Sequence, residues 1–111
     1  MVTSNIIPLI KTIRKNPVAK KTPIVFIEQC IIDIGSIHNE FINSVIEKND
    51  ELNKQVDKAI NKGEKDLFMI KQIGGIDEDS EATVDGLHFN DLGFQRYASH
   101  LISNINDLNI L

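Results

Sequence analysis

The chain has a single cysteine, Cys30, among its 111 residues. One thiol excludes an internal disulfide framework and a zinc site built from several cysteines. Basic residues are also few: 12 Lys and Arg stand against 16 Asp and Glu, which gives a net charge of -4 and a pI near 5.3. Because no basic stripe is available to neutralise phosphates, we do not expect nucleic acid to be the main partner.

Long apolar runs are missing as well. No stretch approaches the roughly 20 apolar residues that a bilayer requires, so we expect no membrane span. Lys11, Arg14 and Lys15 interrupt the first apolar segment, so we expect no signal peptide and a cytoplasmic chain as written. The remaining composition, 41% hydrophobic and 25% charged, is ordinary for a soluble globular domain or part of one.

Two short apolar runs predict the strands of a parallel sheet. Residues 24–27 read Ile-Val-Phe-Ile and residues 67–70 read Leu-Phe-Met-Ile. Continuous β-forming runs of this kind are typical of strands that are buried on both faces. The sequence therefore predicts a sheet that is covered by helices on both sides.

Three helices are expected around these strands. The first spans residues 4–15, and the second begins near Asn39 and ends at Gly63, a suitable residue for the C′ position. The third begins after Asn90, the expected N-cap. Apolar residues three and four apart predict that this last helix buries one face. That face comprises Phe94, Tyr97, Ala98, Leu101, Ile102 and Ile105.

Asp85 and His88 are the candidate catalytic residues. They lie three residues apart between an acidic loop and the last helix, and Gly86 between them can adopt positive φ. A carboxylate that accepts from Nδ1–H orients an imidazole and leaves Nε2 free to deprotonate a nucleophile. On spacing alone, a turn ahead of a helix, with the histidine capping or packing, explains the same two residues. The carboxylates of 77–88 do not predict a calcium loop, because Ala82 and His88 occupy the positions where such a loop needs glycine and glutamate.

Residues 81–94, Glu-Ala-Thr-Val-Asp-Gly-Leu-His-Phe-Asn-Asp-Leu-Gly-Phe, resemble the last sequence block of the SGNH (GDSL-type) hydrolases. That block is an Asp-x-x-His motif that opens the final helix. The resemblance covers essentially the whole chain, which looks like the C-terminal half of such a domain. It implies a three-layer α/β/α, flavodoxin-like fold, of which residues 1–111 form a single partial domain with about two parallel strands and three helices.

The resemblance also implies an activity, the hydrolysis of acyl esters through a covalent acyl-enzyme. Asp85 would orient His88, and His88 would act as the general base for a serine. The substrate would be a small-molecule ester, such as a lipid or an acetylated sugar, and no cofactor is implied. A longer relative can be exported even though this chain shows no signal.

Two departures from the family pattern stand out. Phe89 occupies the position where the family usually has proline. The Gly-Asp-Ser block with the nucleophile is absent, since Ser4, Ser36 and Ser44 lack its context. Cys30 follows the first strand and is an alternative nucleophile, although a small buried thiol is the commoner role. His38 and His100 are expected to be structural or at the surface.

The chain as written is therefore expected to lack a nucleophile. Two other functions stay open: an inactive remnant, or a binding module that offers the unpaired edge of its first strand to a partner. A two-stranded sheet is marginal by itself, and an apolar edge invites association. We accordingly expect the isolated chain to be poorly stable or to self-associate.

Overall fold

The computed structural model describes residues 2–30, 39–72, 81–82 and 88–111. In chain order they form α1 (Val2–Arg14), the short 3-10 helix η1 (Pro17–Ala19), β1 (Ile24–Ile27), α2 (Asn39–Asn61), β2 (Leu67–Ile70) and α3 (Asp91–Leu108). The described residues thus form a mixed α/β fold with three α-helices and two strands, as predicted. The positions of the two strands are confirmed to the residue, and α2 and α3 begin close to the predicted positions, at Asn39 and Asp91.

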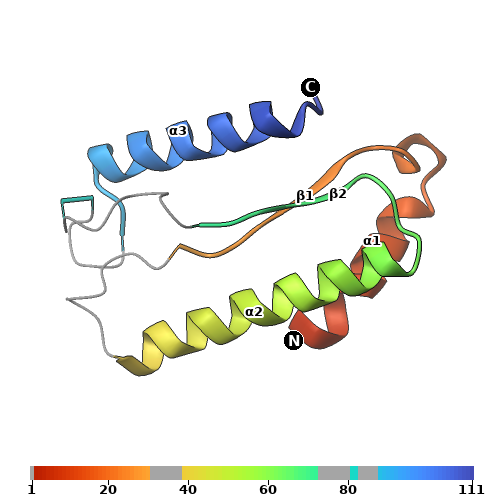
Figure 1. The fold of residues 1–111 in the computed structure, drawn as a ribbon, viewed down its shortest axis with the longest axis horizontal. Helices are drawn as coiled ribbons and strands as arrows, with labels where there is room; N and C mark the ends of the chain where they lie inside the picture. The colour runs from red at the N-terminus through yellow and green to blue at the C-terminus, as the bar shows by residue number, and fades with distance from the viewer. Residues whose placement is uncertain (1, 31–38, 73–80, 83–87) are drawn as a thin grey trace.

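The two strands are parallel and paired in register, with Ile24 opposite Leu67 and Ile27 opposite Ile70. Figure 1 shows α1 and α2 on one side of this sheet and α3 on the other. The carboxyl ends of β1 and β2 point toward the end of the molecule where α3 begins. The predicted α/β/α layering is thus present, and the start of α3 lies at the sheet edge where parallel folds place their sites.

The turn from α2 into β2 has a specific cause in Gly63. Its φ of +104° is a left-handed conformation that favours glycine. Its amide donates to the Ile60 carbonyl at 3.0 Å, and the Glu64 amide donates to the Ala59 carbonyl at 3.1 Å. These two bonds form a Schellman motif, which confirms Gly63 as the C′ residue.

The buried core lies between α1, α2 and the start of the sheet. Ile10, Ala59 and Leu67 form its centre, and Ile24 and Phe26 of β1 pack against them. The prediction for α1 needs one correction, because the helix begins at Val2 and Pro8 therefore lies inside it. Pro8 has no amide hydrogen to donate to the preceding turn, so α1 forgoes one backbone hydrogen bond there.

Arg14, the last residue of α1, joins the segments at the amino-terminal end of the sheet. Its guanidinium donates to the carbonyls of Ala19 at 2.8 Å, Thr22 at 2.6 Å and Lys65 at 2.9 Å. A planar fork of donors suits several carbonyls at once, which a lysine cannot match. One side chain thus holds together the two chain segments that lead into β1 and β2.

The predicted burial of the last helix is wrong in part. Phe94 and Ile102 are 61% and 60% exposed, Ala98 is exposed as well, and Gly93 is the buried residue of α3. β1 is also less covered than predicted, since Ile27 is 39% exposed. The physical reason is the small size of the sheet, because the two described strands, of four residues each, cannot cover the apolar face of an 18-residue helix.

Among the helices of the described residues, none combines the length and apolar character needed to cross a membrane.

Candidate active site

The two candidate catalytic residues differ in what the structure says of them. Asp85 belongs to residues 83–87 and lies outside the described residues. His88 is described: it is exposed and forms a bend two residues ahead of Asn90. The start of α3, which His88 precedes by three residues in the chain, lies toward the carboxyl ends of the strands (Figure 1). The contact between Asp85 and His88 stays a prediction.

Asn90 is the N-cap of α3, as predicted. Its Oδ1 accepts from the Gly93 amide at 2.9 Å. The same residue also contacts the chain ahead of the candidate residues. Its Nδ2 donates to the Glu81 carbonyl at 2.6 Å, and its backbone amide donates to the Ala82 carbonyl at 3.0 Å. The two ends of the segment that contains Asp85 and His88 are therefore bonded to each other.

Phe89 occupies the place where the resemblance expects proline, and its ring packs against two aromatic rings of α3. The ring meets Phe94 edge-on with centroids 5.4 Å apart, and it meets Tyr97 at 5.4 Å with a 48° tilt. Aromatic contacts of this geometry stabilise by roughly 0.5–1.5 kcal/mol each. Packing against α3 thus restrains the residue next to His88.

Cys30 lies beyond β1 and is buried, with 7% of its surface exposed. Burial raises the pKa of its thiol from 9.0 to about 11, although a hydrogen bond with Tyr97 opposes the shift. The pKa of Tyr97 is raised in turn, first by burial and then by Cys30. At neutral pH the thiol is protonated, which argues against a nucleophile and favours a packing role.

Sequence reasoning missed a polar network at the carboxyl ends of the strands. The Glu28 carboxylate accepts from the Asn53 side chain at 2.6 Å and from the Gln72 amide at 3.0 Å. Asn49 exchanges two hydrogen bonds, both 2.9 Å, with the backbone of Gln29. Polar residues directly after an apolar strand were the available signal. This network fixes both strand ends to α2, next to the candidate site.

His100 is structural, as predicted. Its Nε2 lies 2.7 Å from the Lys71 carbonyl, which can only accept, so Nε2 carries the hydrogen. Its Nδ1 then accepts from the Asn104 side chain at 3.4 Å. Both ring nitrogens are therefore engaged, and His100 attaches α3 to the residue that follows β2.

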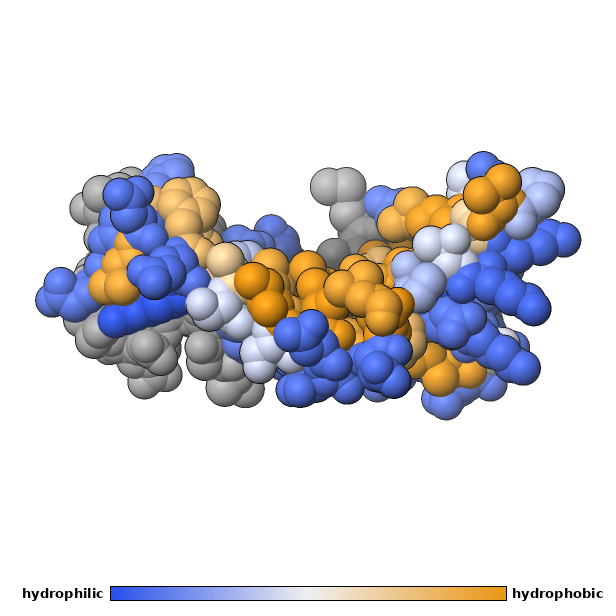
Figure 2. Space-filling model, turned by 90° about the horizontal axis from the view of Figure 1, so that it is seen from above, coloured by the Kyte–Doolittle hydropathy of each residue, from blue (hydrophilic) through white to orange (hydrophobic). Residues whose placement is uncertain are grey.

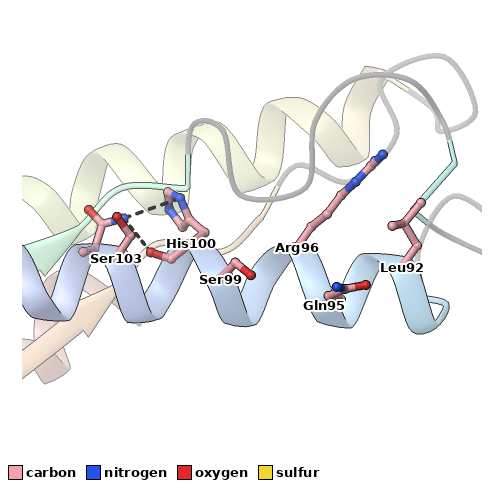
Figure 3. Close-up of a pocket in the computed structure, with 7 residues that line it drawn as sticks. Leu92, Gln95, Arg96, Ser99, His100 and Ser103 are labelled. Carbon is pink, nitrogen blue, oxygen red and sulfur yellow. Dashed lines mark hydrogen bonds between the residues drawn. The ribbon is translucent and has the colours of Figure 1, made fainter.

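Beside His100, an open groove of about 500 Å³ runs along α3 (Figure 3). The groove contains two hydroxyls, but His100 has no ring nitrogen left to activate either of them. It is a polar surface of one helix with no nucleophile–base pair of its own. Its lining residues are Leu92, Gln95, Arg96, Ser99, His100, Ser103 and Asn104.

Among the residues that the structure describes, no group of three or more His, Cys, Asp or Glu side chains could hold a metal ion.

Comparisons with known proteins agree with this architecture. The crystal structure of a presumed GDSL-like lipase from Bacteroides ovatus matches with a TM-score of 0.86 and 30% identity. The match covers 96% of this chain and 31% of that protein, so the chain spans about a third of its length. No curated protein sequence matches the chain. The family model of the GDSL-like lipases and acylhydrolases matches residues 1–106, and the chain belongs to this family.

Proposed function

We propose that the chain supplies the acid and base residues of an acyl-ester hydrolase whose nucleophilic serine lies in another part of the domain. Asp85 orients His88 through Nδ1–H, and His88 is the general base. The observation that carries the proposal is that His88 comes two residues before the N-cap of α3, a helix that begins toward the carboxyl ends of the strands, in a chain of this family.

In the proposed reaction, His88 Nε2 removes the serine proton as the serine oxygen attacks the ester carbonyl. The imidazolium, stabilised by the Asp85 carboxylate, then returns that proton to the departing alcohol, and the acyl group stays on the serine. His88 then deprotonates a water molecule that attacks the acyl carbonyl, and as the acyl–oxygen bond breaks the imidazolium returns this proton to the serine oxygen and the acid is released. A lipid or an acetylated sugar is the proposed class of substrate.

The rotation of α3 about its axis supports the proposal that residues 1–111 are part of a larger domain. His100 contacts the residue after β2, and Tyr97 contacts Cys30 beyond β1. At 3.6 residues per turn, these two side chains are about 60° apart around the helix. One direction of rotation therefore leads from the β2 side of α3 to the β1 side.

The exposed apolar residues Phe94, Ala98 and Ile102 lie farther around the helix in this same direction, roughly 60–140° beyond Tyr97. The opposite rotation from His100 leads to polar Arg96, Ser99 and Ser103. The apolar side of α3 thus lies beyond β1, where a neighbouring strand would sit beneath it. Figure 2, which looks onto the α3 side of the molecule, shows apolar surface in the middle of this face.

The first test is nuclear magnetic resonance of the 111-residue chain, with the imidazole nitrogens labelled. We expect His88 to carry its hydrogen on Nδ1, and Asp85→Asn to shift this tautomer equilibrium. His100→Gln is the control, because it identifies the His100 signal and should leave His88 unchanged. A His88 tautomer that is indifferent to Asp85→Asn would refute the proposed pair.

The second test is turnover of a short-chain chromogenic ester. The chain alone should show none, and so should His88→Ala and Cys30→Ser. A chimeric domain, with residues 1–106 in place of the matching third of the Bacteroides ovatus protein, should hydrolyse the ester, and the unaltered Bacteroides ovatus domain is the comparison. There His88→Ala should lower kcat by roughly 10³-fold or more. Turnover by the chain alone that His88→Ala abolishes and Cys30→Ser does not would show that a serine of this chain is the nucleophile.

A second candidate function uses the same surface. The outer edge of β1 pairs with no strand of the described residues, and the apolar side of α3 flanks it. A partner could add a strand there by β-augmentation. A folded chain that captures an extended peptide, but is inactive in the chimeric domain, would favour this binding module. Failure in both assays would favour an inactive remnant.

A further inference from the structure

Asn90 has a larger set of contacts than a helix cap needs. Capping uses its Oδ1, which accepts from the Gly93 amide at 2.9 Å. Its Nδ2 donates to the Glu81 carbonyl at 2.6 Å, and its backbone amide donates to the Ala82 carbonyl at 3.0 Å. Serine and aspartate cap helices as well as asparagine does, but neither offers a side-chain donor for Glu81. The choice of asparagine therefore points to the contact with Glu81.

Gly93 makes room for the same contact. It is buried in the first turn of α3, and a Cβ built on it would lie 2.1 Å from the Ala82 carbonyl oxygen. Alanine is the better helix former, so helix propensity does not account for glycine here. The Ala82 carbonyl can sit against the first turn of α3 only because residue 93 has no side chain.

We propose that Asn90 is a positioning residue for the Asp85–His88 pair, and that Gly93 leaves the space that the Ala82 carbonyl needs beside α3. Both candidate catalytic residues lie in the segment between Ala82 and Asn90. Hydrogen bonds between the two ends of that segment restrict it in advance. They therefore lower the conformational-entropy cost of bringing Asp85 and His88 into contact. This inference rests on the proposed function, since it presumes that Asp85 and His88 act together.

The test compares Asn90→Ser and Gly93→Ala in the 111-residue chain. Both keep a capped or stronger helix, while the first removes the donor to Glu81 and the second displaces Ala82. The readout is the tautomer signal of His88, recorded with and without Asp85→Asn. We expect the effect of Asp85→Asn on His88 to be lost in both backgrounds, with α3 retained by circular dichroism. Asp91→Ala, which alters the same first turn, is the control and should preserve the effect.

The outcomes separate the two proposals. If Asp85→Asn shifts the His88 signal equally in the parent chain and in both variants, the proposed pair stands and the positioning role is overturned. If Asp85→Asn has no effect even in the parent chain, the proposed function fails and the inference fails with it. Loss of the effect in the Asp91→Ala control too would mean that Asn90 acts only by stabilising the helix, which also overturns the inference.

Discussion

At the scale of single residues, the chemistry of Cys30 is set by its surroundings. With a pKa raised to about 11 from 9.0, the thiolate fraction at pH 8 should be about 100-fold lower in the folded chain than in the unfolded one. We expect iodoacetamide to modify the native protein more slowly than the urea-unfolded protein by at least that factor. Equal rates at pH 8 would show that Cys30 is neither buried nor shifted.

The same shift makes stability depend on pH. The pKa of Cys30 is higher in the folded chain than in the unfolded one. The contribution of the protonated thiol to the free energy of unfolding is therefore fully present below pH 9 and is lost as pH rises toward about 11. The loss should be of the order of 2 kcal/mol. Urea unfolding between pH 8 and 11 measures it, with Cys30→Ala as the comparison. A variant whose stability falls as steeply as that of the parent chain would contradict this source of the pH dependence.

At the scale of elements, Asn49 connects α2 to the residue after β1. Asn49→Ala removes both hydrogen bonds to Gln29 and leaves a partly buried amide and carbonyl without them. We expect a loss of about 1–3 kcal/mol in the free energy of unfolding. Asn43→Ala, at an exposed position of the same helix, should change it by less than roughly 0.5 kcal/mol. Similar losses for the two variants would place the effect in the helix and not in the contact with Gln29.

Arg14 has the corresponding role at the other end of the sheet. Arg14→Lys keeps the charge but cannot reach three carbonyls with a planar fork, so we expect a loss of about 2–3 kcal/mol. Lys15→Ala, one residue along and exposed, is the control and should have little effect. Because the Arg14 contacts lie at the opposite end of the strands, the His88 tautomer should be the same in both variants, as nuclear magnetic resonance can check.

The elements were predictable because each depends on local patterns. Apolar runs marked β1 and β2, Gly63 marked the end of α2, and Asn90 marked the start of α3. Contacts between distant residues left no such mark. Arg14 donates to Lys65, 51 residues away, and Glu28 accepts from Gln72, 44 residues away. The polar residues after β1 and β2 indicated where a network could form, but which polar side chain meets which partner is decided by packing, so the contacts of the network and the role of Arg14 could not be predicted.

At the scale of the whole molecule, the exposed apolar side of α3 predicts association. The isolated chain should self-associate as its concentration rises, and Ile102→Asp should weaken this because it places a charge on that side. Ser103→Asp, on the polar side of the same helix, is the matched control. Sedimentation velocity over a range of concentrations measures both variants. A parent chain that stays monomeric at every concentration would contradict the prediction that the apolar side of α3 causes association.

The burial of α3 was the prediction that failed, and the reason lies at this scale. The spacing of Phe94, Ala98 and Ile102 shows that one side of the helix is apolar, but it does not show what covers that side. The fold itself was predictable, because the motif around His88 is typical of the GDSL-like family and the family resemblance implies an α/β fold. The geometry of the candidate pair is a separate matter, since Asp85 lies outside the described residues.

One consequence follows from the place of Tyr97. The chain has no tryptophan and one tyrosine, and that tyrosine lies against Phe89, next to His88, and against Cys30. Light absorbed near 280 nm is therefore absorbed almost entirely at this spot. The intrinsic fluorescence of the unlabelled protein reports the ring environment beside the candidate base, so a ligand or a second chain that binds there would change this fluorescence without any added dye.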